Sequence, residues 1–271
     1  MLSPMLKWAG GKRKLLPSMI ERIPDNFNRY VEPFVGGGAM FFELRSRNLI
    51  TGAVLSDVNS DLISLYTIIR DKPEQLIESI VDLDYRNNRE DFNRAREEFN
   101  SNPLPVRKAA LMIYLNRHCF NGLYRVNFSG KFNVPFGRYN NPVIPGKEQI
   151  MEVSGSLKNV DLKCCDFENS IREAGERDFV YLDPPYQPIS ETSSFTSYSS
   201  GGFGEKEQRR LARVFRDASS SGVFLMISNS DSPLIRELYS EFKISNILAA
   251  RNINSNGKGR GKINEVLITN Y

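Results

Sequence analysis

The apolar positions of this chain fall into two patterns, short apolar runs and longer segments with helical spacing. Apolar runs bounded by turn residues are typical of buried strands. They predict strands at residues 30–34, 53–56, 160–164, 179–182, 223–228 and 266–269. Helical spacing lies between several of them, at residues 12–22, 39–47, 61–70, 206–220 and 234–241. Strands that alternate with helices predict an α/β fold with a largely parallel sheet.

The alternation changes in two places. Residues 243–250 and 264–271 flank a polar segment without a helix between them, which predicts an antiparallel hairpin that closes the sheet. Between residues 60 and 158 only helices are expected, at residues 73–82, 89–100 and 105–119. A loop rich in Gly, Asn, Phe and Arg follows them. We therefore expect a catalytic domain from residues 1–60 and 158–271, and a mainly helical recognition domain from residues 61–157.

The composition narrows the class of protein. The chain has 271 residues, 40% hydrophobic and 25% charged, as in ordinary soluble globular proteins. The longest apolar run falls short of the ~18 residues of a membrane helix, so we expect a cytoplasmic protein. A single histidine and three cysteines without a CxxC pair argue against histidine triads, metal sites and a disulfide framework. A net charge of +4 permits nucleic-acid binding.

The stretch DFVYLDPPYQP, residues 178–188, ends a buried strand with an acid, two prolines and a tyrosine. Proline cannot donate to a β ladder, so the strand must stop there. One interpretation is a strand end capped by a rigid turn. The other is a site for a flat, polar, aromatic substrate. The Ser/Gly-rich segment 190–204 follows, and we interpret it as a mobile loop, either one that closes over the site or an ordinary surface loop.

A glycine turn follows the first expected strand. EPFVGGG precedes a helix at residue 39, an arrangement that lets a ligand approach the backbone, although glycines also serve helix–sheet packing. Asp57 ends the second strand about 20 residues later, where an acid commonly binds a ribose. The turn lacks the GxGxxG spacing of dinucleotide folds. This favours S-adenosylmethionine over NAD as the ligand.

Four motifs occur in a characteristic order: LKWAGGKRKLLP at 6–17, VEPFVGGGAMFFEL at 31–44, SDVNSDLISLY at 56–66 and YLDPPY at 181–186. Together with LNRHCFNGLYRVNFSGKFNVPFGRY at 115–139, they resemble the Dam-type DNA adenine-N6 methyltransferases of the α group. The resemblance extends from residue 6 to the C-terminus. It implies a Rossmann-like methyltransferase sheet and a target-recognition insertion with a DNA-reading hairpin at 118–142. It also implies methyl transfer from S-adenosylmethionine to adenine N6 of duplex DNA within GATC, by a monomer that needs no metal.

The resemblance also assigns residues to the cofactor. They are Trp8, Ala9, Gly10, Gly11, Lys12, Phe34, Gly36, Gly38, Asp57, Asp166 and Asp183. Lys12 would pair with the methionine carboxylate and Asp57 would bind the ribose. Asp166 would contact the cofactor adenine, or else cap a helix. Trp8 would line the cofactor or belong to the core.

The expected catalytic residues are Asp183, Pro184, Pro185 and Tyr186. The Asp183 carboxylate would accept one N6–H of adenine and the Pro184 carbonyl the other, which directs the nitrogen lone pair at the methyl group. Tyr186 would stack on the base. Since an adenine inside a duplex cannot reach such a pocket, the base is expected to flip out.

The expected DNA contacts lie in three segments. They are Lys7, Phe120, Asn121, Leu123, Arg125, Pro135 and Tyr139, with Arg251, Lys258, Arg260 and Lys262 on the C-terminal hairpin. Arg125 would bind guanine O6 and N7, and Phe120 would wedge into the base stack, where the family can carry tyrosine. Ordinary surface or packing roles are the alternative for each side chain.

Two other functions remain open from the sequence. One keeps the chemistry and changes the substrate to cytosine N4, an RNA base or a protein amide, and the NGLYR loop argues against it. The other is a catalytically silent DNA-binding module, which would not need the glycine turn, Asp57 and DPPY together.

Overall fold

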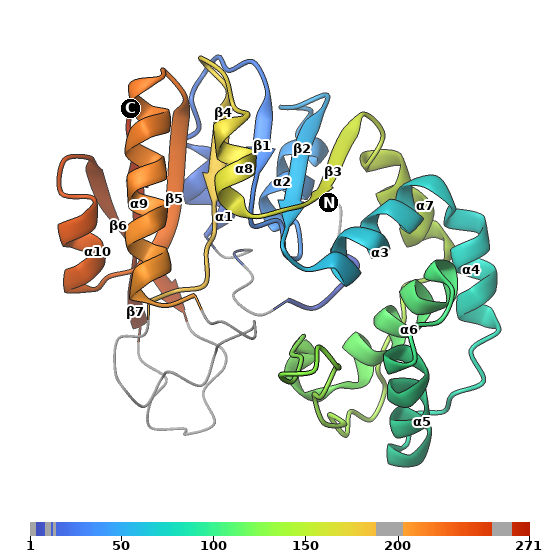
Figure 1. Cartoon of the computed structure of the whole chain (residues 1–271). Coiled ribbons are helices and arrows are strands. Elements are labelled where there is room, and N and C mark those ends of the chain that lie inside the picture. Colours follow the sequence, from blue (N-terminus) through green and yellow to red (C-terminus); the bar gives the residue numbers. More distant parts are fainter. Residues whose placement is uncertain (1–3, 9–11, 13–14, 188–202, 251–261) are drawn as a thin grey trace.

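The computed structural model describes residues 4–8, 12, 15–187, 203–250 and 262–271 (Figure 1). Its described strands form one seven-stranded sheet in the order β3-β2-β1-β4-β5-β7-β6. The strands are β1 (Tyr30–Glu32), β2 (Ala53–Asp57), β3 (Val160–Cys164), β4 (Phe179–Leu182), β5 (Phe224–Ser230), β6 (Lys243–Ala250) and β7 (Lys262–Thr269). The predicted α/β fold is confirmed.

The first five strands are parallel, and the last two are not. β1 pairs with both β2 and β4, so the sheet grows in opposite directions from the centre. β7 is antiparallel to β5 and to β6, and it lies between them. The predicted C-terminal hairpin is therefore confirmed, with its second strand beginning at Lys262 rather than residue 264.

Side chains of the central strands alternate between two cores, because successive residues of a strand point to opposite faces. Phe179 and Tyr181 of β4 belong to one core, while Val180 and Leu182 belong to the other. All four are buried, as expected for a parallel strand covered on both faces. This explains why 179–182 reads as a continuous apolar run.

Helices cover both faces of the sheet. On one side lie α1 (Leu16–Ile20), α2 (Ala39–Ser46) and α3 (Ser60–Asp71), and on the other lie α8 (Phe167–Arg172), α9 (Glu205–Ser220) and α10 (Pro233–Leu238). The first helix is shorter than the predicted 12–22. The six-residue α8 was not among the predicted helices, but Asp166 caps it, so the alternative helix-cap role expected for that residue is confirmed.

A helical group continues from α3 past the β3 edge of the sheet (Figure 1). It consists of α4 (Pro73–Val81), α5 (Arg89–Asn100), α6 (Pro105–His118) and α7 (Lys147–Ser156). α6 is buried along most of its length because α3, α4 and α5 all pack on it. α7 was not predicted, and it packs against α3 and α4. The domain boundaries at residues 60/61 and 157/158 stay a prediction, because α3 contacts both the sheet and α6.

Across the described part of the chain, no helix combines the length and the apolar character needed to cross a membrane.

Candidate active site

The DPPY motif lies at the carboxyl edge of the parallel strands. Asp183 follows β4, Glu32 ends β1 and Asp57 ends β2, and these three strands are neighbours in the sheet. The chain leaves β1 toward β2 and β3 on one side and later returns to β4 and β5 on the other. Open α/β sheets bind ligands at such a switch point, outside the carboxyl ends of the strands.

Asp183 is held by two side chains distant from it in sequence. The ammonium Nζ of Lys12 lies 3.0 Å from Asp183 Oδ1, and the hydroxyl of Ser228 donates to the same oxygen at 2.9 Å. Lys12 is almost fully buried and lies 4.3 Å above the centre of the Tyr186 ring. The structure thus brings together Lys12, Asp183 and Tyr186, which the motifs had placed in one site. The predicted contact of Lys12 with a methionine carboxylate stays a prediction.

Glu265 of β7 completes this cluster and was not predicted. Its Oε2 accepts a 2.6 Å hydrogen bond from the Tyr186 hydroxyl and lies 4.0 Å from Lys12 Nζ. The sequence carries a weak signal for it, an acid beside the apolar run 266–269. Only the sheet order places β7 close enough to β4 for this contact.

A second carboxylate, Glu32, lies buried behind the motif. Tyr30 donates to Glu32 Oε2 at 2.8 Å, and burial raises the pKa of Glu32 to about 8, with the charge of Asp183 adding to the rise. Burial also raises the pKa of Tyr181 and Tyr186 above their ordinary range. Glu32 therefore keeps its proton at neutral pH, while the carboxylates of Asp183 and Glu265 outnumber the Lys12 ammonium, an arrangement that favours a positively charged ligand.

The glycine turn packs closely on Trp8 and is tied to Asp57. The backbone N–H of Gly36 donates to Asp57 Oδ2 at 3.2 Å, and that of Asn59 donates to Oδ1 at 2.9 Å. Gly36 has a positive φ of 45°, and a Cβ there would lie 2.7 Å from Trp8 Nε1. Burial raises the pKa of Asp57. The packing role of the glycines is thus visible, and the turn holds the Asp57 carboxylate through the Gly36 N–H.

Aromatic rings continue the site beyond Asp57. Phe34 stacks on Phe167 at 5.4 Å and meets Phe203 edge-on at 5.6 Å. Asp166, next to them, is the N-cap of α8 and forms a two-pronged ion pair with Arg210 at 2.7 and 2.8 Å. The adenine contact predicted for Asp166 stays a prediction.

The predicted DNA-reading residues gather around the hairpin that follows α6. Lys7 Nζ lies 4.4 Å above the Tyr139 ring, and the Tyr139 hydroxyl accepts from the backbone N–H of Asn121 at 2.9 Å. Phe120 is 49% exposed although large and apolar, and Leu123 is half-buried. The structure therefore brings Lys7 together with Asn121 and Tyr139, which lie more than a hundred residues later in the sequence.

Arg125 is anchored on this hairpin. Its Nε and Nη2 donate to the side-chain and backbone oxygens of Asn133, at 2.7 and 3.3 Å. The side chain is exposed, as is Pro135. Phe128 at the hairpin turn is 96% exposed, and it was not among the predicted contacts.

Some predicted residues cannot be placed. They are Ala9, Gly10, Gly11, Arg251, Lys258 and Arg260, which lie outside the described residues. Lys262 begins β7, but only its backbone is described.

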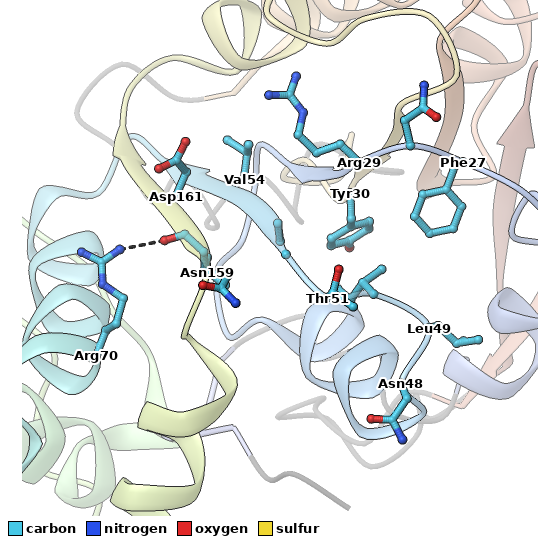
Figure 2. Close-up of a pocket in the computed structure, with 15 residues that line it drawn as sticks. Phe27, Arg29, Tyr30, Asn48, Leu49, Thr51, Val54, Arg70, Asn159 and Asp161 are labelled. Atoms are coloured by element: carbon cyan, nitrogen blue, oxygen red, sulfur yellow. Dashed lines mark hydrogen bonds between the residues drawn. The ribbon is translucent and has the colours of Figure 1, made fainter.

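A separate hollow lies away from the DPPY motif (Figure 2). It has a volume of about 810 Å³ and lies at the amino ends of β1, β2 and β3, the sheet edge opposite the DPPY motif. Its two arginines are already engaged: Arg29 pairs with Asp178 at 2.9 Å, and Arg70 donates to the Val160 carbonyl at 2.7 Å. We therefore place the chemistry at the DPPY edge.

Among the described residues no cluster of three or more His, Cys, Asp or Glu is arranged to hold a metal ion.

Residues 8–253 match the model of a protein family described as D12 class N6 adenine-specific DNA methyltransferase. The chain belongs to this family. It is 46% identical to the Type II methyltransferase M1.LlaDCHI of Lactococcus lactis subsp. cremoris, over 100% of this chain and 96% of that protein. It is 40% identical to the Type II methyltransferase M.MjaIII of Methanocaldococcus jannaschii, over 100% and 99%. The DNA adenine methylase of Escherichia coli K12 is 38% identical, over 97% and 93%.

Membership of the D12 class confirms the resemblance found in the ordered motifs, and this chain is an adenine-specific DNA methyltransferase. The substrate of a D12 enzyme is an adenine in DNA, so the alternatives of cytosine, RNA, protein amides and a catalytically silent module are set aside.

Proposed function

We propose that this D12 methyltransferase transfers a methyl group from S-adenosylmethionine to the N6 of an adenine flipped out of duplex DNA, within the sequence GATC. The observation that carries the proposal is the cluster at the end of β4. There the Asp183 carboxylate, next to the two rigid prolines and the Tyr186 ring, is fixed by Lys12 and Ser228.

The residues at the carboxyl edge fit this cofactor. The positively charged sulfonium and amino group of this cofactor suit the carboxylates of Asp183 and Glu265, which outnumber the Lys12 ammonium. Asp57 presents a carboxylate where a ribose is bound in related folds, and the backbone N–H of Gly36 holds one of its oxygens. The partly exposed Phe34 ring, which stacks on the buried Phe167, offers flat apolar surface for a nucleobase. When bound, the cofactor supplies an electrophilic methyl group.

The chain's own residues prepare the acceptor nitrogen. The lone pair of an adenine N6 is delocalised into the ring, so the nitrogen needs acceptors that draw its two hydrogens out of the ring plane. Asp183 provides one acceptor and the Pro184 carbonyl the other. Positive charge develops on N6 during transfer, and the Asp183 carboxylate stabilises that charge. Lys12 and Ser228 keep that carboxylate in one orientation.

The target base must leave the helix to reach this edge. The half-exposed Phe120 suits the wedge that fills the vacated stack, and Asn121 beside it is held by Tyr139. Tyr186 supplies the stacking face on the enzyme side, and its ring is fixed by the Glu265 hydrogen bond. The assignment of GATC rests on the likeness of residues 115–139 to the Dam-type recognition segment and on Arg125 as a guanine reader.

The test uses plasmid DNA free of adenine methylation and S-adenosylmethionine labelled on the methyl group. We expect label in N6-methyladenine, and protection of GATC sites from an endonuclease that cleaves only the unmethylated sequence. No label in DNA would refute the transfer. Label at other adenines with GATC sites left cleavable would refute the recognition site and leave the chemistry standing.

A further inference from the structure

Two buried amide side chains lie against the DPPY motif and have no role in the function proposed above. Gln208 is in the first turns of α9, and Asn229 is near the end of β5, and both are 0% exposed. Gln208 Nε2 donates to the Pro185 carbonyl at 2.9 Å, and Asn229 Nδ2 donates to Gln208 Oε1 at 3.1 Å. These two residues form what we call the amide clamp.

The clamp also holds the residue that follows the motif. Asn229 Oδ1 accepts from the backbone N–H of Gln187 at 3.4 Å and from that of Ser230 at 2.8 Å. The Ser230 hydroxyl in turn donates to the Gln187 carbonyl at 2.9 Å. Backbone groups on both sides of Tyr186 are therefore fixed by side chains of α9 and β5.

The backbone of the motif shows why such a clamp matters. The proline rings fix φ at Pro184 and at Pro185, and ψ of Pro184 is restricted because a proline follows it. The one soft dihedral of the pair is ψ of Pro185, which sets the direction in which the chain enters Tyr186. That dihedral orients the Pro185 carbonyl, the atom that accepts from Gln208. Ring chemistry thus fixes three angles, and the clamp fixes the fourth.

We propose that Gln208 is a positioning residue for methyl transfer, which fixes ψ of Pro185 through its hydrogen bond, and that Asn229 orients the Gln208 amide for this task. The clamp acts on the Tyr186 ring, because ψ of Pro185 sets the direction in which the chain enters Tyr186. This inference rests on the proposed function, since it assumes that Tyr186 stacks on the target adenine.

The test compares full-length Gln208→Met and Gln208→Glu with the wild type. Methionine keeps the length of the side chain and removes both hydrogen bonds. We expect the single-turnover methylation rate at saturating S-adenosylmethionine and duplex to fall about 10- to 100-fold. The Kd values for both ligands are expected to change less than about threefold, because the clamp acts through the motif. Arg209→Met, on the exposed side of α9, is the matched control and is expected to keep the wild-type rate.

The Gln208→Glu variant is expected to show a pH dependence of the methylation rate that loss of packing alone does not produce. An ionised glutamate accepts from Asn229 but cannot donate to the Pro185 carbonyl, whereas a protonated glutamate can. We therefore expect the rate of this variant, relative to wild type, to rise as the pH is lowered. The Gln208→Glu variant also tests the proposal if the Gln208→Met variant fails to fold.

The outcomes separate the two proposals. A wild-type enzyme that labels no adenine refutes the proposed function and this inference with it. An active wild type whose Gln208→Met rate stays within about twofold refutes the clamp alone. So does a Gln208→Glu rate that keeps a constant ratio to wild type across pH, or a rate loss explained by weaker substrate binding.

Discussion

The carboxylate of Asp183 lies between a buried ammonium and a hydroxyl, and each contact constrains it. Lys12 stabilises its charge and Ser228 fixes the direction of Oδ1. The carboxylate is therefore prepared before a base arrives, and no reorganisation is needed during transfer. Lys12 Nζ also lies 4.0 Å from Glu265 Oε2, so a carboxylate remains near the ammonium when Asp183 is removed.

Asp183→Ala is expected to lower methyl transfer by at least about 100-fold, since one of the two acceptors for the N6 hydrogens is lost. DNA binding is expected to persist because the recognition hairpin is untouched. Methyl incorporation and a gel-shift assay on the same duplex measure the two properties. Asp161→Ala, an exposed acid at the opposite sheet edge, is the control. Substantial turnover by Asp183→Ala would contradict the role.

Glu32 predicts how stability depends on pH. Its pKa is about 8 in the folded protein against an ordinary value of 4.5, so the folded state keeps a proton that the unfolded state releases. Stability from this group is complete below about pH 4.5 and is lost as the pH rises toward 8, with a slope of up to about 1.4 kcal/mol per pH unit.

Glu32→Gln removes this ionisation. The melting temperature of the variant relative to wild type is therefore expected to rise steadily from pH 5 to pH 8, as measured by differential scanning fluorimetry. Glu21→Gln, an exposed acid, should give a curve parallel to that of wild type. A constant difference between Glu32→Gln and wild type would show that Glu32 ionises normally in the folded protein.

At the scale of single residues, contiguous motifs were predictable and long-range partners were not. Asp183 to Tyr186 stand together in the sequence, and their chemistry was recognisable there. Ser228, Glu265 and Gln208 reach the motif from β5, β7 and α9, and no local pattern marks them as its neighbours. Their positions depend on the sheet order.

At the scale of elements, the apolar runs predicted the strands, because these strands are buried on both faces. Amphipathic spacing predicted the long helices. α8 was missed because it has six residues and forms where Asp166 caps a short polar segment. α7 was missed because its polar and small residues hide the helical spacing, and contacts with α3 and α4 stabilise it. Tertiary packing decides such elements more than local preference does.

The recognition hairpin carries two exposed cations to which we assign different tasks: Arg125 is proposed to read a base, and Lys131 to contact the backbone of any DNA. Arg125→Ala is expected to relax discrimination at one base pair, by about 1–3 kcal/mol. Lys131→Ala, an exposed cation on the same hairpin, is expected to weaken binding to all sequences and reduce the salt slope by about 1. Methylation of a pool with randomised sites and salt-dependent Kd values measure the two effects. An unchanged site profile for Arg125→Ala would remove it from the readout.

α6 connects this hairpin to the N-terminal segment through one amide. The buried Asn116 side chain accepts from the Lys7 N–H at 2.8 Å, and donates to the Lys7 carbonyl at 2.8 Å and the Gly122 carbonyl at 3.0 Å. Asn116→Ala is expected to lower the free energy of unfolding by about 1–3 kcal/mol, because buried backbone groups lose their partners.

The same variant is expected to reduce sequence discrimination, since Lys7 loses its fixed place beside Tyr139. Urea denaturation measures the stability, and the randomised pool measures the discrimination. Asn140→Ala, which changes an exposed asparagine of the recognition hairpin, is the control. Unaltered discrimination in a destabilised Asn116→Ala would show that Lys7 does not read DNA.

At the scale of the whole molecule, the sheet order gathers the chemistry at one edge. Glu32, Asp57 and Asp183 come from three strands spread over 150 residues of sequence, and they meet because β2, β1 and β4 are adjacent. The opposite edge holds a hollow of about 810 Å³, whose two arginines are already paired. The direction of the strands is therefore the better guide to the site.

The cofactor proposal is tested by the stability of the whole protein. A ligand that binds only the folded state at about 100 times its Kd adds about 2.7 kcal/mol, which shifts the melting temperature of a protein of this size by about 5–10 °C. We expect this shift with S-adenosylmethionine and none with NAD, because the glycine turn lacks the dinucleotide spacing. Asp57→Ala, which removes the carboxylate proposed to bind the ribose, is expected to lose most of the shift while remaining folded. A shift with NAD, or an Asp57→Ala variant that responds to S-adenosylmethionine as the wild type does, would contradict the assignment of the ligand or of its ribose contact.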